Sequence, residues 1–252
     1  MYDWLLGGHN NFPSDREACQ RLLEIAPSTK ELALNNRAFL RRVVKEIAEK
    51  YKIRQFIDHG SGLPVQDNVH QVAQAASAGA KVVYVDNDPI VLSYGRALLE
   101  GDENVAIVGA SMTDTEAIWE NQQVSQLINR KEPVAALFVS VIHCLPDEAE
   151  PAAMIRRTVE HLVPGSVVVI CQLVSPHPKI RQDVTQLMEE ATGGSWGRVR
   201  TEEEVRAYFD GLHIEDPGLL DVTDWRPDRE RGLVRRQQSD EWTEYGGLAI
   251  VR

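Results

Sequence analysis

Gln55-Phe-Ile-Asp-His-Gly-Ser-Gly-Leu-Pro64 and Lys81-Val-Val-Tyr-Val-Asp-Asn-Asp88 are the two segments that decide the fold of this chain. In the first, an apolar run ends at Asp58, a tight turn follows from Gly60 to Gly62, and a helix is expected to begin near Pro64. In the second, another apolar run ends at Asp86. Strand, glycine turn, helix and second strand in this order predict a βαβ crossover of a parallel sheet.

The glycine turn and the acid that closes the second strand are the features that bear on function. Glycine lets the backbone approach a ligand where a Cβ would collide, and a terminal acid can accept hydrogen bonds from both ribose hydroxyls. The turn alone is a weak signal, but the turn and Asp86 together predict a site for an adenosine-containing cofactor. A helix N-cap is the alternative role for Asp86, although Asp88, before Pro89, is the better cap candidate.

The turn lacks the third glycine of the dinucleotide fingerprint, since Leu63 and Pro64 follow Gly62. This disfavours NAD and FAD, and with them a nicotinamide oxidoreductase. A smaller adenosyl ligand without a pyrophosphate, such as S-adenosylmethionine, demands less of the helix N-terminus. The sequence also has no Gly-x-Ser-x-Gly, His-Glu-x-x-His or phosphate-loop motif, and no spacing typical of a metal site.

Composition places the chain among ordinary globular proteins. Of its 252 residues, 43% are hydrophobic and 26% are charged, and no apolar run approaches the roughly 18 residues of a membrane span. The N-terminus shows no basic and apolar export signal. Cys19, Cys144 and Cys171 form no CxxC pair, so we expect a reducing, cytoplasmic compartment.

The net charge of -11 disfavours a nucleic acid partner, because a phosphate backbone would be repelled. The densest basic stretch, Arg226 to Arg236, is interrupted by Asp228 and Glu230, and we interpret it as a solvated loop. A small-molecule substrate is therefore favoured. Four dispersed aromatic residues could line an apolar acceptor pocket or simply belong to the core: Trp4, Tyr94, Trp196 and Trp225.

The order of apolar runs predicts an α/β fold. Five runs of strand character, with helical segments between them, cover 55–57, 81–85, 105–108, 134–141 and 166–174, and two closing strands are expected at 212–214 and 248–251. Several runs are apolar at nearly every position, which is typical of parallel strands covered on both faces. We expect a three-layer fold with a mostly parallel sheet of about seven strands, in a single domain (1–252) with an N-terminal helical cap (1–52) and a core (53–252).

Two helix starts are predicted from capping boxes. A long helix over 28–51 begins with Ser28 and Glu31, and a short helix from Thr201 to about Asp210 begins with Thr201 and Glu204.

Several segments resemble a family of Rossmann-like S-adenosylmethionine-dependent methyltransferases long catalogued as a domain of unknown function. The matching segments are Tyr2-Asp-Trp-Leu-Leu-Gly-Gly8 with Asn11-Phe12, Asn36-Arg-Ala-Phe-Leu-Arg-Arg42, Gly60-Ser-Gly-Leu-Pro64, Asn68-Val-His70, Val83-Tyr-Val-Asp-Asn-Asp-Pro89, Pro217-Gly-Leu219 and Trp225-Arg-Pro-Asp228. They span nearly the full length. The chain departs from the family pattern at His9-Asn10, at His59, and at Ala110-Ser111-Met112, which lacks the Asp that commonly meets the adenine amino group.

The resemblance, with the βαβ pattern, implies an S-adenosylmethionine site, with S-adenosylhomocysteine as product. Its candidate residues are Tyr2, Gly7, Gly8, Arg37, Asp58, Gly60, Ser61, Gly62, Asp86, Asn87, Ser111, Met112 and Ser140. The glycine turn would lie against the methionine moiety, with Asp86 at the ribose. Asn87 and Met112 would flank the adenine, although Met112 could equally belong to the core.

Some of these roles have a structural alternative. Arg37 would bind the methionine carboxylate or form a surface salt bridge, and Asp58 would orient the turn, contact the cofactor's amino group or simply end a strand. Gly7 and Gly8 would belong to a lid over the cofactor or to a turn between helices.

His143, at the end of the fourth strand, is the candidate general base or else a packed histidine. His9, His59 and His70 are expected to be structural or exposed. Two functions stay open: a methyltransferase acting on an unidentified, small-molecule acceptor, and a non-catalytic sensor or structural protein that binds the same cofactor.

Overall fold

Five parallel strands, in the spatial order β3-β2-β1-β4-β5, form most of the sheet, and β8 continues it antiparallel to β5. The computed structural model describes residues 1–64, 67–99, 101–194, 196–227 and 241–252. The strands are β1 (Gln55–His59), β2 (Lys81–Asp86), β3 (Val105–Gly109), β4 (Ala135–Val139), β5 (Val167–Val174), β6 (His213–Ile214), β7 (Leu220–Asp221) and β8 (Thr243–Ile250). The predicted three-layer, mostly parallel fold is confirmed, with the short strand β7 paired to β8 as the unexpected eighth strand.

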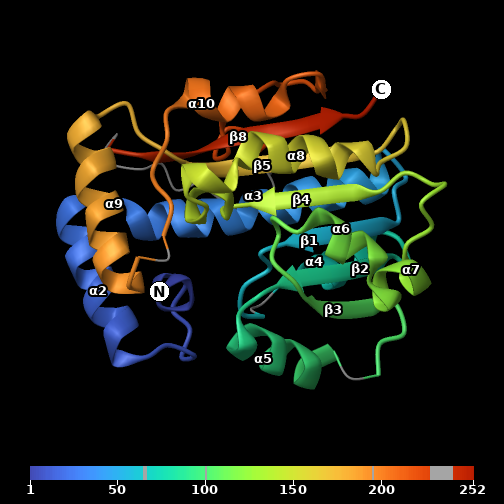
Figure 1. The fold of residues 1–252 in the computed structure, drawn as a ribbon, viewed down its shortest axis with the longest axis horizontal. Helices are drawn as coiled ribbons and strands as arrows, with labels where there is room; N and C mark the ends of the chain where they lie inside the picture. Colours follow the sequence, from blue (N-terminus) through green and yellow to red (C-terminus); the bar gives the residue numbers. More distant parts are fainter. Residues whose placement is uncertain (65–66, 100, 195, 228–240) are drawn as a thin grey trace.

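Helices cover both faces of this sheet (Figure 1). They are α1 (Tyr2–Leu5), α2 (Pro13–Ile25), α3 (Thr29–Glu49), α4 (Val69–Ala76), α5 (Pro89–Leu99), α6 (Thr115–Glu120), α7 (Gln122–Leu127), α8 (Pro151–Glu160), α9 (Pro178–Thr192) and α10 (Glu202–Arg206). Single 3₁₀ turns occur at η1 (Ile142–Cys144), η2 (Asp147–Ala149) and η3 (Ala207–Phe209).

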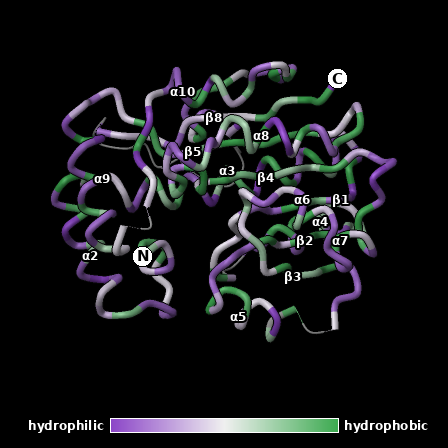
Figure 2. Tube along the Cα trace, viewed as in Figure 1, coloured by the Kyte–Doolittle hydropathy of each residue, from purple (hydrophilic) through white to green (hydrophobic). Residues whose placement is uncertain are grey.

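Two hydrophobic layers hold the helices to the sheet. One face packs against α3, α4 and α5 through residues such as Val43, Ala73 and Leu92, and the other packs against α6, α7, α8 and α10 through residues such as Trp119 and Met154. In Figure 2 the strands are largely hydrophobic along their length, whereas hydrophilic and hydrophobic residues alternate along α2 and α9. This difference follows from burial on both faces for the strands and on one face for those two helices.

The helices α1, α2 and α9 gather at one end of the sheet, beyond the carboxyl ends of the parallel strands (Figure 1). They pack through smaller apolar clusters that include Leu22, Leu5 and Leu187. The long helix α3 runs from this group along the sheet face, so the first 52 residues contribute both to the end group and to a sheet layer.

The strand order reverses between β1 and β4, because β2 and β3 extend the sheet on one side and β5 on the other. In open α/β sheets, ligands bind in the crevice outside the carboxyl ends of the strands at such a switch point. The loops after β1 and β4 are therefore the expected walls of a site.

Two helix starts test the capping predictions. The box of Thr201 and Glu204 is confirmed, since each side chain accepts from the other residue's backbone N–H. The box of Ser28 and Glu31 was wrong, because the Ser28 hydroxyl donates to Glu241 Oε1 over 2.7 Å instead of capping α3.

The helix expected near Pro64 begins at Val69, where Asn68 is the N-cap and its backbone N–H donates to Gln71 Oε1. A polar cap thus decides this start, and the helix begins five residues beyond Pro64.

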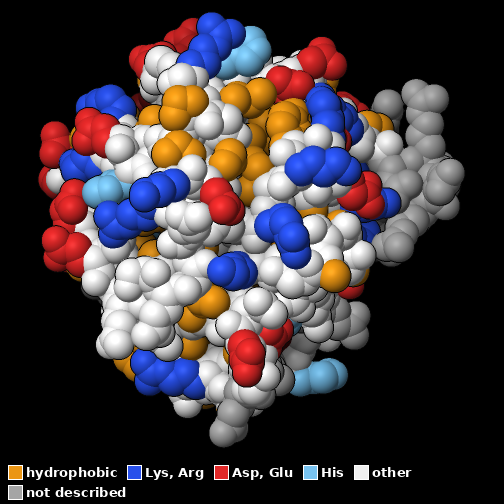
Figure 3. Space-filling model, turned by 90° about the vertical axis from the view of Figure 1, so that its right-hand side faces the viewer, with side chains coloured by type: hydrophobic (Ala, Val, Ile, Leu, Met, Phe, Trp, Pro, Cys, Tyr) orange, Lys and Arg blue, Asp and Glu red, His pale blue; other side chains and the backbone are white. Residues whose placement is uncertain are grey.

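In the described part of the chain, the helices are too short or too polar to cross a membrane. On the face displayed in Figure 3, Lys and Arg side chains alternate with Asp, Glu and uncharged side chains. The arginine-rich stretch interpreted above as a solvated loop falls largely within 228–240, outside the described residues.

Candidate functional site

The glycine turn after β1 is held against β2. The backbone N–H groups of Gly60 and Ser61 donate to Val85 O over 2.8 and 3.2 Å. Gly60 has a φ of +67°, and a Cβ there would lie 2.2 Å from Val141 Cγ2. Gly62 has a φ of +66°, yet no atom lies within 4 Å of its Cβ position. Gly60 is thus needed for packing, whereas Gly62 borders open space.

Asp86 fastens this turn to the end of β2. Its Oδ2 accepts from Gly62 N over 2.8 Å, and its Oδ1 accepts from Asp88 N over 3.0 Å. Asp88 caps α5 by accepting from Ile90 N, as expected, so the cap role does not fall to Asp86. The Asp86 carboxylate lies at the switch-point edge of the sheet, beside the glycine turn.

The loop after β3 joins the same edge, because Ala110 N donates to Asp86 O over 3.0 Å. Met112 reaches back to the glycine turn, and its Cε is 3.2 Å from the Cβ position of Gly60. The Ser111 and Thr113 hydroxyls are 2.7 Å apart, and Asn87 is exposed. These residues form the outer part of the site.

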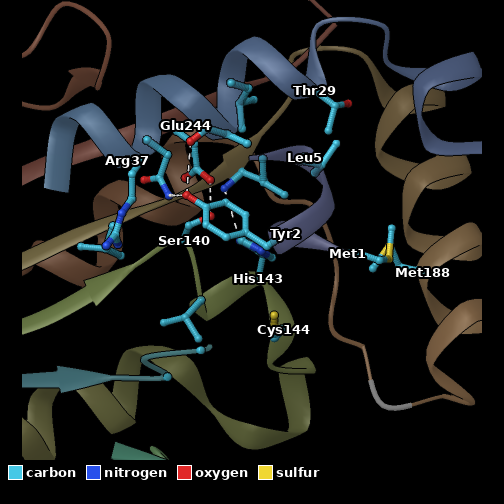
Figure 4. Close-up of a pocket in the computed structure, with 18 of the residues that line it drawn as sticks. Met1, Tyr2, Leu5, Thr29, Arg37, Ser140, His143, Cys144, Met188 and Glu244 are labelled. Atoms are coloured by element: carbon cyan, nitrogen blue, oxygen red, sulfur yellow. Dashed lines mark hydrogen bonds between the residues drawn. The ribbon is translucent and has the colours of Figure 1, made fainter. Parts of the chain in front are cut away.

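A cavity of about 320 Å³ begins at the glycine turn and extends beneath α1 toward α9. Its walls are mostly apolar and include Leu22, Leu32, Val184, Met188 and Trp242. Figure 4 shows Tyr2 projecting into its middle, between Arg37, Ser140, Glu244 and His143. Asn36 Nδ2 donates to the Tyr2 hydroxyl over 3.0 Å, and this hydroxyl donates to Ala33 O, which fixes the ring in place.

The cavity brings together eight of the predicted residues, from four parts of the chain. They are Tyr2, Arg37, Asp58, Gly60, Ser61, Gly62, Ser140 and His143. Six others lie outside its lining, at the outer edge or in the N-terminal turn: Gly7, Gly8, Asp86, Asn87, Ser111 and Met112.

Gly7 and Gly8 form the turn that ends α1. Gly7 has a φ of +81°, and a Cβ on Gly8 would lie 2.1 Å from Asp3 Oδ1. Asn11 Nδ2 donates both to Asp3 Oδ2 and to Gly8 O, which closes the turn. These contacts close the turn that follows α1.

Arg37 and Asp58 form the charged part of the wall beside the glycine turn. Burial raises the pKa of Asp58 to about 7, while the Arg37 guanidinium opposes this rise and the Asp86 carboxylate adds to it. Arg37 Nη2 donates to Asp67 O over 2.8 Å, so the loop before α4 holds its guanidinium.

His143 is buried in η1, and the backbone N–H of Leu173 donates to its Nδ1 at 3.5 Å. Burial and, to a lesser extent, Arg200 lower the pKa of His143 to about 3. In the neutral ring an accepting Nδ1 leaves the proton on Nε2, which then donates and cannot accept. This arrangement favours the packed histidine over the general base.

Glu244 on β8 is a lining residue that sequence reasoning missed. Its side chain is 2% exposed, the Ser140 hydroxyl donates to its Oε1, and its Oε2 has no hydrogen-bond partner among the described residues. Burial raises the pKa of Glu244 to about 8, opposed by the Ser140 and Cys171 hydrogen bonds. The available signal was an acidic residue just before the last apolar run, but the last strand was expected to begin only at 248, so Glu244 was not placed on it.

Arg200 was also missed. Its side chain is 2% exposed, and its guanidinium donates to Ile142 O, Leu145 O and Asp147 Oδ1. It therefore fixes the segment that carries His143.

The remaining histidines and aromatic residues divide between core and surface. His59 stacks on Phe138 at 4.2 Å, and its Nδ1–H donates to Leu137 O. His70 contacts Tyr84 through Nδ1, and His9 is exposed. Of the four aromatic residues considered for an acceptor pocket, Trp196 lines the cavity, Trp225 is buried against Phe39, Trp4 packs on the α1 cluster, and Tyr94 is exposed.

Cys144 also lines the cavity. Burial, with smaller contributions from Glu244 and Asp86, raises the pKa of its thiol to about 12, so the thiol stays protonated at neutral pH.

A family model described as S-adenosyl methyltransferase matches residues 1–252. A DUF574 family protein from Streptomyces avermitilis is 30% identical, with a TM-score of 0.90 over 100% of this chain and 95% of that one. A protein from Thermobifida fusca, described as a candidate methyltransferase, is 33% identical, with a TM-score of 0.88 over 100% and 93%.

A more distant structure shares the fold. The plantazolicin methyltransferase BamL, solved with S-adenosylhomocysteine and a substrate analogue, is 12% identical and has a TM-score of 0.55 over 99% of this chain and 94% of that one. No curated protein matches the chain.

Proposed function

This chain belongs to the S-adenosyl methyltransferase family, and we propose that it methylates a small molecule held in the cavity beneath α1. As a member of this family it is an S-adenosylmethionine-dependent methyltransferase. The observation that carries the proposal is an apolar cavity that starts at the glycine turn and is roofed by the protein's own N-terminal helices.

The residues at the switch point fit the cofactor. Gly62 borders open space that a Cβ would occupy, and the Asp86 carboxylate lies beside it as an acceptor for ribose hydroxyls. We assign the methionine moiety to the turn from Gly60 to Gly62, with its carboxylate toward Arg37 and its ammonium toward Asp58.

The adenosine would lie at the outer edge, between the loops after β2 and β3. Asn87, Ser111 and Met112 would border the adenine there, and Asp86 the ribose. Tyr2 and Ser140 would contact the methionine end from the cavity side, while Gly7 and Gly8 would act only by shaping the turn behind α1.

The acceptor would occupy the part of the cavity beyond Tyr2. Its apolar walls and its volume of about 320 Å³ suit a small molecule, and the net charge of -11 disfavours a nucleic acid. We also propose that the protein acts in the cytoplasm. Residues 1–252 would form a single domain in which the helices α1 and α2 close the site.

The protein's contribution to the reaction is positioning. S-adenosylmethionine supplies the reactive methyl group when bound. Tyr2, locked by Asn36, and the helices above it would exclude water and hold the acceptor in line with that group.

Isothermal titration with S-adenosylmethionine and S-adenosylhomocysteine tests the cofactor site. We expect Asp86→Asn to weaken both by tenfold or more, since a hydrogen bond to a charged acceptor contributes roughly 1.5 to 3 kcal/mol. Asp88→Asn is the matched control, because it leaves the neighbouring carboxylate in place and should keep the affinity. Equal affinities for Asp86→Asn and the unaltered protein would contradict the site.

Transfer of a labelled methyl group into a size-fractionated cell extract tests the acceptor class. We expect label in the low-molecular-weight fraction. Label found only in protein or nucleic acid, or no transfer by a protein that binds the cofactor, would refute a small-molecule acceptor.

A further inference from the structure

Glu244 is a buried carboxyl group that the cofactor site does not use. It lines the same cavity as Arg37 and Asp58, and Figure 4 shows it above Ser140 and beside Tyr2. Only one of its two oxygens has a hydrogen-bond partner among the described residues. A carboxylate buried in this way is stable only when a cation or further hydrogen bonds satisfy it.

Among the described residues, the groups that act on Glu244 are neutral or acidic. The Ser140 hydroxyl and the Cys171 thiol approach it, Cys144 and Tyr2 lie on the cavity side, and Asp221 on β7 adds a second negative charge. Among the described side chains that line the cavity, the charged ones are Arg37, Asp58 and Glu244. Arg37 acts on Asp58, and no cation among the described residues acts on the pKa of Glu244 in the same way.

The backbone at Ser140 supports a binding role for this corner. Ser140 has a φ of +57°, in the left-handed region that a non-glycine residue rarely adopts. Strain of this kind persists at ligand sites, where the surrounding structure holds it. The Ser140 hydroxyl donates to Glu244 Oε1, and Oε2 is buried without a hydrogen-bond partner among the described residues.

We propose that Glu244 binds the acceptor, and that the acceptor is an amine on an apolar body. The inference rests on the methyltransferase function proposed above. The ammonium group would donate to Glu244 Oε2 and supply the missing cation, while its apolar part would contact residues such as Leu22, Val184 and Met188.

Glu244 also prepares the nitrogen for methylation. An ammonium has no lone pair, so one N–H bond breaks, the proton passes to Glu244 Oε2, and the bonding pair stays on nitrogen as the free lone pair. A carboxyl group that is readily protonated in its buried site suits this exchange, and it returns the proton to water when the site opens.

Binding of simple amines tests this assignment. The probes are benzylamine and 2-phenylethylamine, each paired with its alcohol, titrated calorimetrically into protein saturated with S-adenosylhomocysteine. We expect the amines to bind more tightly than the alcohols, and Glu244→Gln to weaken the amines at least tenfold while the affinity for S-adenosylhomocysteine changes less than twofold.

Asp58→Asn is the matched control, since it removes the other cavity carboxyl. It should weaken the cofactor and leave amine binding largely unchanged. Difference infrared spectroscopy supplies a second readout: adding an amine to the unaltered protein should reduce the band of a protonated carboxylic acid, and this change should be missing in Glu244→Gln.

The proposal is overturned if the cofactor binds but neither amine does, if the alcohols bind as well as the amines, or if Glu244→Gln binds the amines normally. A protein that fails to bind S-adenosylhomocysteine at all would instead overturn the proposed function, so the two failures are distinguishable.

Discussion

Replacing Glu244 by Gln should remove a pH-dependent cost of folding. In the folded protein, burial raises the pKa of this carboxyl from 4.5 to about 8. A carboxyl whose pKa is raised by folding stabilises fully below its unfolded pKa, and this stability is lost as pH rises through the folded value. The folded state keeps a proton over this window while the unfolded state releases it, so the unaltered protein loses stability between about pH 4.5 and about pH 8.

The magnitude follows from the shift. At about 1.4 kcal/mol per pH unit, the unaltered protein should lose roughly 4 kcal/mol relative to Glu244→Gln between about pH 5 and about pH 9. For a chain of this size that difference corresponds to a melting-temperature change on the order of 10 °C. Gln keeps the shape of Glu and can still accept from Ser140, so the cavity wall is preserved.

Urea unfolding of both proteins across this pH range measures the difference between their unfolding free energies. The titration of all other groups cancels in this difference. Glu241→Gln is a control, because Glu241 is also buried but accepts hydrogen bonds from the backbone N–H and the hydroxyl of Ser28. If the two unfolding free energies run parallel from about pH 5 to about pH 9, Glu244 does not carry its proton in the folded state and the reasoning is refuted.

Three further outcomes are expected from single substitutions. Gly60→Ala should destabilise the fold and abolish cofactor binding, because its Cβ would lie 2.2 Å from Val141 Cγ2. Gly62→Ala, which faces open space, should cost about 1 kcal/mol of stability in thermal melting yet weaken cofactor affinity tenfold or more. Equal effects of the two substitutions on melting would contradict the assignment. Burial lowers the pKa of His59 to about 4, so the protein loses stability as pH falls below about 6.5, and His59→Gln should remove roughly 3 kcal/mol of this loss. Urea unfolding at about pH 7 and about pH 4.5 measures the loss. An equal loss in the unfolding free energy of both proteins would disprove this role of His59. Arg200→Met should cost about 3 kcal/mol of unfolding free energy in denaturant, because the carbonyls of Ile142 and Leu145 lose their donor. Arg198→Met, which removes a half-exposed ion pair with Glu204, should cost under about 1 kcal/mol. Similar losses in the two variants would argue against the role of Arg200.

Local patterns determined the fold class and the cofactor edge of the site. The continuous apolar runs required strands buried on both faces, and the glycine turn with Asp86 identified the crossover at which ligands bind. These features lie within about 30 residues of one another, so neighbouring positions in the sequence carry the information. The Thr201 box and the Asp88 cap were readable for the same reason, since each involves residues two or three positions apart.

Distant contacts decided the rest. The Ser28 side chain donates to Glu241, which is 213 positions away, instead of capping α3. The helix α4 begins where Asn68 can cap it. Glu244 reaches the site only because β8 pairs antiparallel with β5, opposite Leu173. Whether His143 accepts or donates depends on the Leu173 N–H, and whether a carboxyl is charged depends on burial by α1 and α3, which are remote in sequence from β8. Residue type sets what a side chain can do, but protonation and hydrogen-bond partners depend on the low-dielectric surroundings that only the folded chain assembles.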